Sequence, residues 1–299
     1  MVIKGYVCLE EKVLNEVLNL ESICNDYENL LGSMFLDSSL NFNHCINCVF
    51  LLYENRELIS MLSMFIPTQQ EAEITGYTLP KYRGNGYFKA LLAKAVEELK
   101  KFDVPEILFV CETQSNSGKK ALDALKAEYE HTEYSMRLDQ SESENRTGGV
   151  YSYRLVLLRP EPEDLEKIIE TSIRTFDEPY EEAKSRIENC VESETREQYL
   201  AVLDDVPIGL GSTNQEDEVG TIFGYGIVPE YRGKGYGEEL LHLIVDSLWQ
   251  KGKTEVVLDV NSENYQALAL YKKFGFKVEV AYEYYRLKIV VTTHLADVD

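Results

Sequence analysis

The chain has 299 residues, a length that suits two domains better than one, because a domain usually contains about 100–200 residues. Hydrophobic residues make up 44% and charged residues 27%, which excludes a largely disordered or collagen-like chain. No apolar run approaches the roughly 18 residues of a membrane span, and residues 1–5 lack a basic region followed by an apolar stretch. We therefore expect a soluble, cytoplasmic protein.

The formal net charge is −22, with −9 on residues 1–149 and −13 on residues 150–299. A negative field repels phosphate backbones and anionic lipids, so it argues against nucleic acid and membrane partners and favours a cationic substrate. The six cysteines are sparse for a chain of this length, unlike a secreted disulfide framework. We expect most of them to be buried as small hydrophobic side chains.

A polar segment separates two halves that each show hydrophobic periodicity. Residues 140–149 contain no aliphatic side chain, which predicts domains at 1–140 and 150–299 joined by a linker at 141–149. An internal repeat supports this division. Residues 80–87 (PKYRGNGY) and 229–236 (PEYRGKGY) share six of eight residues at a spacing of 149.

Each half reads as an antiparallel meander followed by a βαβ unit. The expected strands precede the repeated motif, at 48–53, 58–66 and 71–79 in the first half and at 199–203, 207–212 and 219–228 in the second. Helical spacing of apolar residues follows the motif, and a further strand comes at 107–111 or 255–260. Because a βαβ crossover returns parallel, we expect each half to be a mixed sheet with helices packed on it.

The motif in the second half continues to Gly237 and lies between a strand and a helix. Amides at the start of a helix lack intrahelical partners and attract anions, and glycines let a diphosphate approach the backbone closely. Arg232 and Lys234 add positive charge. A tightly packed glycine turn without a ligand is the alternative. Two better-known phosphate-binding motifs do not match this sequence. The dinucleotide-binding GxGxxG motif requires glycine where Glu238 stands, and the P-loop requires glycine where Ser247 stands.

This turn resembles the acyl-CoA diphosphate signature of the GNAT superfamily of N-acetyltransferases, and Asn264, Ala267, Tyr271 and the pair 275–276 resemble its second signature. The resemblance implies two tandem GNAT-like α/β domains of the α+β type, each with a mixed, mostly antiparallel, twisted sheet flanked by helices. It also implies that the pantetheine arm of acetyl-CoA pairs near Ile227 and Val228. The implied CoA-binding residues are Ile227, Val228, Arg232, Gly233, Lys234, Gly235, Tyr236, Gly237 and Asn264.

Tyr271 is the candidate catalytic residue. It shares a helix face with Ala267, Leu270 and Phe274, so a packing role is one reading. Its place in the resemblance favours the other, in which it gives a proton to the departing thiolate. Gly275 is placed to end this helix.

The first half departs from the pattern. Phe88 replaces the last glycine of the turn, and aligning residues 121–122 with 267–268 puts Gly118 at Asn264 and Leu125 at Tyr271. We therefore expect a degenerate copy, retained for packing or for shaping the substrate site.

Other candidate sites carry weaker signals. His44, Cys45 and Cys48 have the spacing of half a zinc site without a second pair nearby, so we expect no metal. The remaining histidines, His131, His242 and His294, are isolated. Residues 282–285 alternate as a strand, although their tyrosines could line a substrate channel.

These signals predict transfer of an acetyl group from acetyl-CoA to a primary amine, with the chemistry in the C-terminal domain. A backbone amide near Val228 would stabilise the oxyanion, and no carboxylate in residues 219–228 offers a general base. The acceptor would be a cationic small molecule or peptide. The alternatives are a non-catalytic module that binds acyl-CoA or another phosphorylated ligand, and a structural scaffold without CoA affinity.

Overall fold

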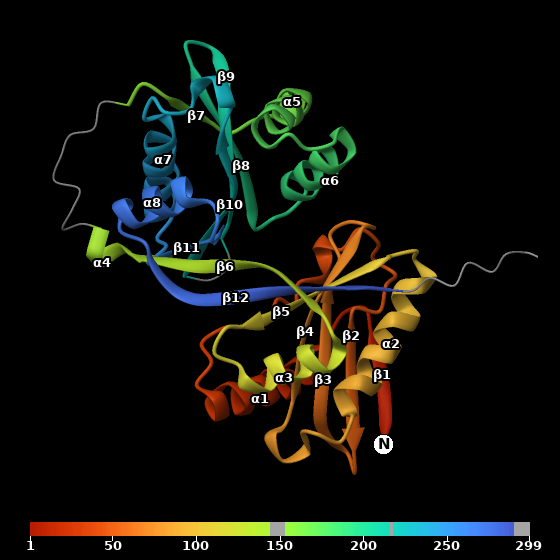
Figure 1. Ribbon diagram of the computed structural model, residues 1–299. Helices are drawn as coiled ribbons and strands as arrows, with labels where there is room; N and C mark the ends of the chain where they lie inside the picture. The colour runs from red at the N-terminus through yellow and green to blue at the C-terminus, as the bar shows by residue number, and fades with distance from the viewer. Residues whose placement is uncertain (144–152, 216–217, 290–299) are drawn as a thin grey trace, which may run out of the picture. The chain divides into compact units, whose positions relative to one another are not determined.

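The structure is a computed structural model and describes residues 1–143, 153–215 and 218–289 (Figure 1). Contacts divide the chain into two compact units. Unit 1 contains Met1–Glu133 and Val280–Asp299, and unit 2 contains Tyr134–Glu279. None of the helices in the described ranges combines the length and the apolar character needed to cross a membrane.

The units differ from the predicted domains at two places. Residues 134–140 fall in the first predicted domain and belong to unit 2, whereas the chain from Val280 onward falls in the second predicted domain and belongs to unit 1. Most of the predicted linker at 141–149 lies outside the described residues, so the linker stays a prediction.

Unit 1 is a mixed sheet in the order β1–β2–β3–β4–β5–β12, whose paired neighbours are antiparallel except for the parallel pair β4 and β5. Its strands are β1 (Val2–Tyr6), β2 (Val49–Glu54), β3 (Glu57–Phe65), β4 (Glu71–Thr78), β5 (Glu106–Glu112) and β12 (Lys277–Lys288). Its helices are α1 (Glu11–Glu28), α2 (Tyr87–Lys101) and α3 (Asn116–Leu125), with short 3₁₀ turns at Ser38–Leu40 and Pro80–Tyr82.

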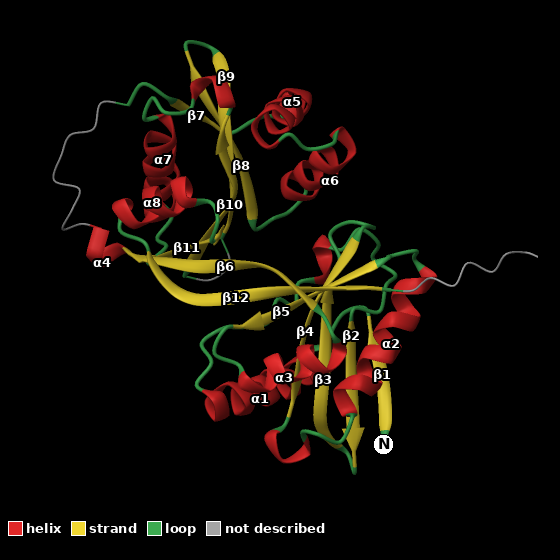
Figure 2. Cartoon of the chain, viewed as in Figure 1, coloured by secondary structure: helices red, strands yellow, loops and turns green. Residues whose placement is uncertain are grey.

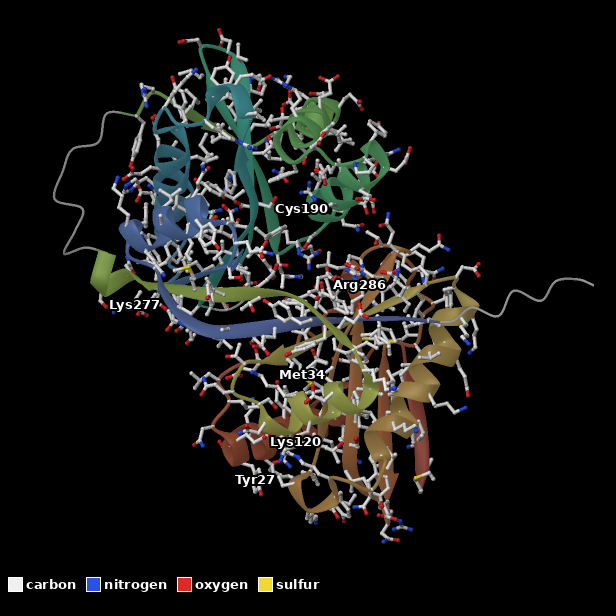
Figure 3. The ribbon with its side chains drawn as sticks, viewed as in Figure 1. Tyr27, Met34, Lys120, Cys190, Lys277 and Arg286 are labelled. Carbon is white, nitrogen blue, oxygen red and sulfur yellow. The ribbon has the colours of Figure 1, made fainter. Side chains whose placement is uncertain are left out.

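Arg286 fastens β12 to unit 1 (Figure 3). Its guanidinium donates to Glu71 at 2.7 Å and to Glu106 at 2.5 Å, and it also pairs with Glu130. The last described strand of the chain is thereby held in the sheet of the first unit.

Unit 2 is a mixed sheet in the order β6–β11–β10–β9–β8–β7, with β10 and β11 parallel. Its strands are β6 (Glu128–Asp139), β7 (Val156–Leu158), β8 (Arg196–Leu203), β9 (Val206–Asn214), β10 (Val219–Ile227) and β11 (Glu255–Asn261). Its helices are α4 (Gln140–Ser143), α5 (Leu165–Phe176), α6 (Tyr180–Val191), α7 (Tyr236–Gln250) and α8 (Tyr265–Phe274), with 3₁₀ turns at Pro162–Asp164 and Pro229–Tyr231.

The two faces of the unit 2 sheet carry separate cores. Helices α7 and α8 pack on one face, where Leu241, Leu258 and Tyr271 are buried together. Helices α5 and α6 pack on the other, where Ile169 and Ile187 are buried. Figure 2 shows the two helix pairs on opposite sides of β8–β10.

The predicted mixed, mostly antiparallel sheets flanked by helices are confirmed, and the predicted strands and helices lie within a few residues of the observed ones. The repeat also proves more regular than its motif. From β3 and β9 through β6 and β12, every matching strand and longer helix begins and ends 149 residues apart, except that β10 begins 148 residues after β4.

This constant spacing corrects one predicted alignment. Helix α3 begins after Ser115, whose side chain accepts a hydrogen bond from the Gly118 amide, and α8 begins after Asn264, whose side chain accepts one from the Ala267 amide. The caps therefore match Ser115 with Asn264. By the same spacing, the counterpart of Tyr271 is Leu122, which is buried, and the pairing with Leu125 is wrong.

Candidate active site

The glycine turn of unit 2 leaves a group of backbone amides without partners. Gly233 and Gly235 have φ angles of 75° and 87°, in the left-handed region that favours glycine. Helix α7 begins after Gly235 without a side-chain cap, and its first backbone bond runs from Glu239 to the Gly235 carbonyl. Within the described residues, the amides of 233–238 have no backbone acceptor, so they can bind an anion.

The two basic side chains of the turn, Arg232 and Lys234, donate hydrogen bonds to backbone carbonyls. Arg232 donates to the Ile227 carbonyl at 2.7 Å and to the Thr175 carbonyl at 2.6 Å, so it braces the turn against β10 and α5. Lys234 donates to the Glu230 carbonyl at 3.0 Å. Both basic side chains belong to the turn that carries the free amides.

Sequence reasoning missed a third cation at the turn, Arg154. Its guanidinium lies 4.4 Å from the Tyr236 ring centre, donates to the Lys234 carbonyl at 3.3 Å and pairs with Glu239 at 3.2 Å. Residue 154 lies 80 positions before Lys234, so no local motif could have indicated it.

The strands beside this turn diverge. Parallel pairing of β10 with β11 runs from Val219–Glu255 to Ile222–Leu258, although both strands continue beyond that point. Their facing edges are therefore unpaired toward the turn, and an extended ligand arm can hydrogen-bond there. The β4–β5 pair of unit 1 diverges in the same way after Ile74.

A β-bulge distinguishes β10 from its counterpart. Phe223 pairs with Ser212 and Gly226 with Leu210, so two residues between them oppose Gly211 alone. A bulge leaves backbone groups unpaired. In unit 1, β3 and β4 keep one continuous register, so the matching segment has no bulge.

The predicted oxyanion donor is a backbone amide near Val228. The amide of Val228 itself donates to the Ile208 carbonyl at 2.9 Å and is therefore already used. The bulge at Gly224 and Tyr225 comes shortly before Val228 and leaves a residue without a partner in the ladder, so the donor near Val228 stays a prediction.

Tyr271 is buried in the core beneath α7 and α8, next to the bulge residue Tyr225. It is 7% exposed, and its ring centre lies 6.2 Å from that of Tyr225 and 5.9 Å from that of Phe276. Its hydroxyl makes no hydrogen bond to any described residue, and burial raises its pKa to about 12. Tyr271 thus packs in the core and also presents an unused phenol. As predicted, Gly275 ends its helix, with φ 121°.

Asn264 has a structural task. Its side-chain oxygen accepts a hydrogen bond from the Ala267 amide at 3.1 Å and so caps α8. Its predicted contact with CoA stays a prediction.

Asp259 is a carboxylate that sequence reasoning missed. It follows Leu258, the last residue of β11 paired with β10. Leu258 and Val260 are buried in the core with α7, so alternation along the strand puts Asp259 on the opposite face. The side chain reaches solvent but is crowded by protein, and the lost hydration raises its pKa, while a hydrogen bond to Ser135 lowers it. The alternating pattern of 255–261 could have indicated this residue.

Helices α5 and α6 cover the outer face of the bulge. A Cβ on Gly226 would lie 3.1 Å from the Phe176 ring, and one on Gly224 would lie 3.1 Å from Arg186. Arg186 is braced in turn by Ser172 at 2.6 Å and by Glu178 at 2.5 Å. The bulge is therefore enclosed by side chains of fixed position.

In unit 1, where β4 and β5 diverge in the same way, the end of α1 hydrogen-bonds to both α3 and the glycine turn. The Glu28 carboxylate accepts hydrogen bonds from the Ser117 amide at 2.9 Å and hydroxyl at 2.6 Å, and pairs with Arg83 at 2.9 Å. These bonds link α1 to α3 and to the glycine turn. They also hold the pKa of Glu28 below its usual value despite burial, which raises it.

The segment after α1 is bound to β5. Glu112, at the end of that strand, accepts hydrogen bonds from the Leu31 amide at 3.1 Å and the Gly32 amide at 2.9 Å. Together with Glu28, this contact places protein across the divergence of β4 and β5.

The weaker candidates fall outside this site. Cys45 and Cys48 are free thiols, and no cluster of metal-binding side chains occurs in the part of the chain that the structure describes. His131 stacks on Tyr284 at 4.4 Å and His242 packs against Phe274, whereas His294 lies outside the described residues. Residues 282–285 form part of β12, as predicted. Four of the six cysteines are buried.

Comparison with known families identifies the chain. The Acetyltransferase (GNAT) family matches residues 14–129 and 164–276, which together exceed half of the sequence. The chain belongs to this family and contains two copies of its domain.

Two curated relatives match short segments. A mycothiol acetyltransferase of Corynebacterium efficiens is 39% identical over 70 residues, covering 22% of this chain and 24% of the relative. A [ribosomal protein bS18]-alanine N-acetyltransferase of Escherichia coli is 36% identical over 56 residues, covering 19% of this chain and 38% of the relative. The chain thus spans about a quarter to two fifths of the length of these relatives.

Two solved structures share the fold of the whole chain. A GCN5-related N-acetyltransferase from Sphaerobacter thermophilus has a TM-score of 0.76 at 16% identity, covering 96% of this chain and 95% of its own. A tandem GNAT protein from the clavulanic acid biosynthesis pathway has a TM-score of 0.72 at 16% identity, covering 96% and 98%. The tandem GNAT arrangement is therefore confirmed.

Proposed function

We propose that unit 2 transfers an acetyl group from acetyl-CoA to a primary amine. The observation that carries the proposal is the divergence of β10 and β11, with free amides of the turn at 233–238 and the unused phenol of Tyr271 beside it. These groups suit a ligand that has a diphosphate, an extended arm and a reactive thioester. Family membership makes acetyl-CoA the natural co-substrate.

Proton removal from the amine falls to Asp259. An alkyl amine with a pKa near 10 is charged at neutral pH and must lose a proton before it attacks. Asp259 stands where the two strands part, on the face away from α7, and its raised pKa makes it a stronger base than an exposed aspartate. An ordered water can carry the proton if the amine does not touch the carboxylate.

The bulge and Tyr271 act on the other side of the reaction. Unpaired backbone amides at 224–225 can donate to the oxygen that becomes negative when the amine adds to the thioester. Tyr271 then protonates the departing thiolate. Since its pKa is raised to about 12, the phenol keeps its proton throughout the neutral range, so a proton is present when the thiolate forms.

The proposed acceptor is a cationic small molecule or peptide amine, because the net charge of −22 attracts cations. The matched relatives are named for mycothiol and for an alanine of a ribosomal protein, so their names do not point to one particular acceptor.

We also propose that unit 1 is a degenerate copy that does not transfer acetyl groups. It has Leu122 in place of the phenol, a regular β4 in place of the bulge, and Glu28 bound across its opening. Its role is then to complete the fold and to shape the site.

The test is release of free thiol from acetyl-CoA by the full chain with a panel of amines. We expect release that depends on the amine and is fastest with cationic ones. Binding of acetyl-CoA by calorimetry without amine-dependent release would instead favour the non-catalytic binding module, and absence of binding would leave only a scaffold.

A further inference from the structure

A buried tyrosine, Tyr271, and a partly buried one, Tyr225, lie next to each other in the unit 2 core, and their hydroxyls differ in hydrogen bonding. Their ring centres are 6.2 Å apart. The Tyr271 hydroxyl has no partner among the described residues, whereas the Tyr225 hydroxyl donates to the Gly237 carbonyl. Burial raises the pKa of Tyr225 well above its usual value, and the nearby Tyr271 and Glu238 raise it further. The Tyr271 hydroxyl is thus free to bind a ligand, whereas the Tyr225 hydroxyl is already hydrogen-bonded within the protein.

The hydrogen bond from Tyr225 to the Gly237 carbonyl connects the two ends of the proposed acetyl-CoA site. Tyr225 lies in the β10 bulge, where the reacting carbonyl would be held. Gly237 lies in the first turn of α7, among the amides proposed to hold the diphosphate. A Cβ on Gly237 would lie 3.4 Å from the Tyr225 hydroxyl, which is an ordinary contact distance, so this hydroxyl lies directly against the first turn of α7.

Unit 1 reverses this pair. By the spacing of α2 and α7, the counterpart of Gly237 is Phe88. Gly76 pairs with Leu62 at the place where the bulge residues Gly224 and Tyr225 oppose Gly211, so Gly76 is the counterpart of the bulge. A Cβ on Gly76 would lie 2.5 Å from the Phe88 ring, so the helix supplies the aromatic side chain and fills the same gap. Packing is preserved, but a phenylalanine has no hydroxyl to tie the strand to the turn. The bond in unit 2 therefore does more than fill space.

We propose that Tyr225 is a positioning residue that sets the distance between the diphosphate-binding turn and the thioester-binding bulge. A ligand that contacts both ends gains affinity only if the ends are held at the right separation, because otherwise binding must also order them. Tyr225 acts through Gly237 and leaves proton donation to Tyr271. This inference rests on the proposed acetyl-CoA site.

The experiment compares Tyr225→Phe with Tyr199→Phe by calorimetry and steady-state kinetics. Tyr199 is the control, because it is a buried tyrosine of the same core whose hydroxyl donates to Glu197 and also contacts Ser247 and Lys251, at the far end of α7 from the turn. The two ligands are acetyl-CoA, which reaches both ends, and 3′-phosphoadenosine 5′-diphosphate, which reaches only the turn. We expect Tyr225→Phe to weaken acetyl-CoA binding about tenfold, the loss of one well-placed hydrogen bond, with less than a twofold change for the fragment.

The kinetic signature is a rise in KM for acetyl-CoA of about tenfold with kcat within threefold of wild type, and Tyr199→Phe should change neither. Unchanged acetyl-CoA affinity in Tyr225→Phe, or an equal loss for the fragment, would overturn the inference. Failure of the wild-type protein to bind acetyl-CoA would instead overturn the proposed function on which the inference rests.

Discussion

Replacing Tyr271 by phenylalanine separates its packing role from its chemical role. Phenylalanine keeps the ring between Tyr225 and Phe276 and removes only the hydroxyl. Because that hydroxyl has no partner among the described residues, its loss breaks no hydrogen bond there. The free energy of unfolding should therefore change by less than about 1 kcal/mol, the typical worth of a hydrogen bond.

The effect on turnover should be much larger. A positioned general acid contributes about 10²-fold or more, so kcat should fall about 100-fold, equivalent to about 2.7 kcal/mol of activation free energy. Acetyl-CoA affinity should be preserved, because the ring remains. The assay is thiol release at saturating acetyl-CoA, with calorimetry for affinity.

Tyr77→Phe is the control for unit 1. Tyr77 lies on β4, and burial raises its pKa above the usual tyrosine value, so it is the kind of phenol that a catalytic unit 1 could use. We expect the Tyr77→Phe variant to have the same kcat as the wild-type protein. Unaltered turnover in Tyr271→Phe would refute the reasoning, since the thiolate would then leave unaided or take its proton from water.

The remaining predictions address the turn, the base and the acceptor. Gly235→Val should abolish acetyl-CoA binding by calorimetry, whereas Gly252→Val, at an open left-handed glycine after α7, should strain the backbone equally and leave binding intact. Asp259→Asn should lower kcat/KM at least 100-fold. With wild type, kcat/KM should rise with pH through the raised pKa of Asp259, since the base must lose its proton. Because that raised pKa means the charged form is less stable in the fold, Asp259→Asn should also raise Tm at neutral pH. With a cationic acceptor, kcat/KM should fall as salt is added, and a flat salt profile would contradict electrostatic attraction.

The sheet and the turn could be predicted because their signals are local. Apolar alternation fixed the meanders, helical spacing fixed α2 and α7, and the motif at 232–237 marked the start of α7. The assignment of β12 to unit 1 could not be predicted in this way, because its residues alternate like any strand and the choice of neighbour depends on distant β5.

The details of the site depended on relations between segments. The bulge at 224–225 exists only as a difference in register between β9 and β10, and the Arg154 contact joins segments 80 residues apart. The alignment of Leu125 with Tyr271 failed because it relied on two identical residues, whereas the helix caps align Leu122. Asp259 could have been predicted from the alternating pattern of residues 255–261, but the search for a general base covered only the strand at 219–228.

The most direct test of the central claim is a crystal structure of the full chain with bound acetyl-CoA. The account predicts the diphosphate on the amides of 233–238 and the thioester carbonyl at the bulge of β10, with the sulfur close to the Tyr271 hydroxyl. Acetyl-CoA bound only at the glycine turn of unit 1, or with its thioester away from Tyr271, would contradict it.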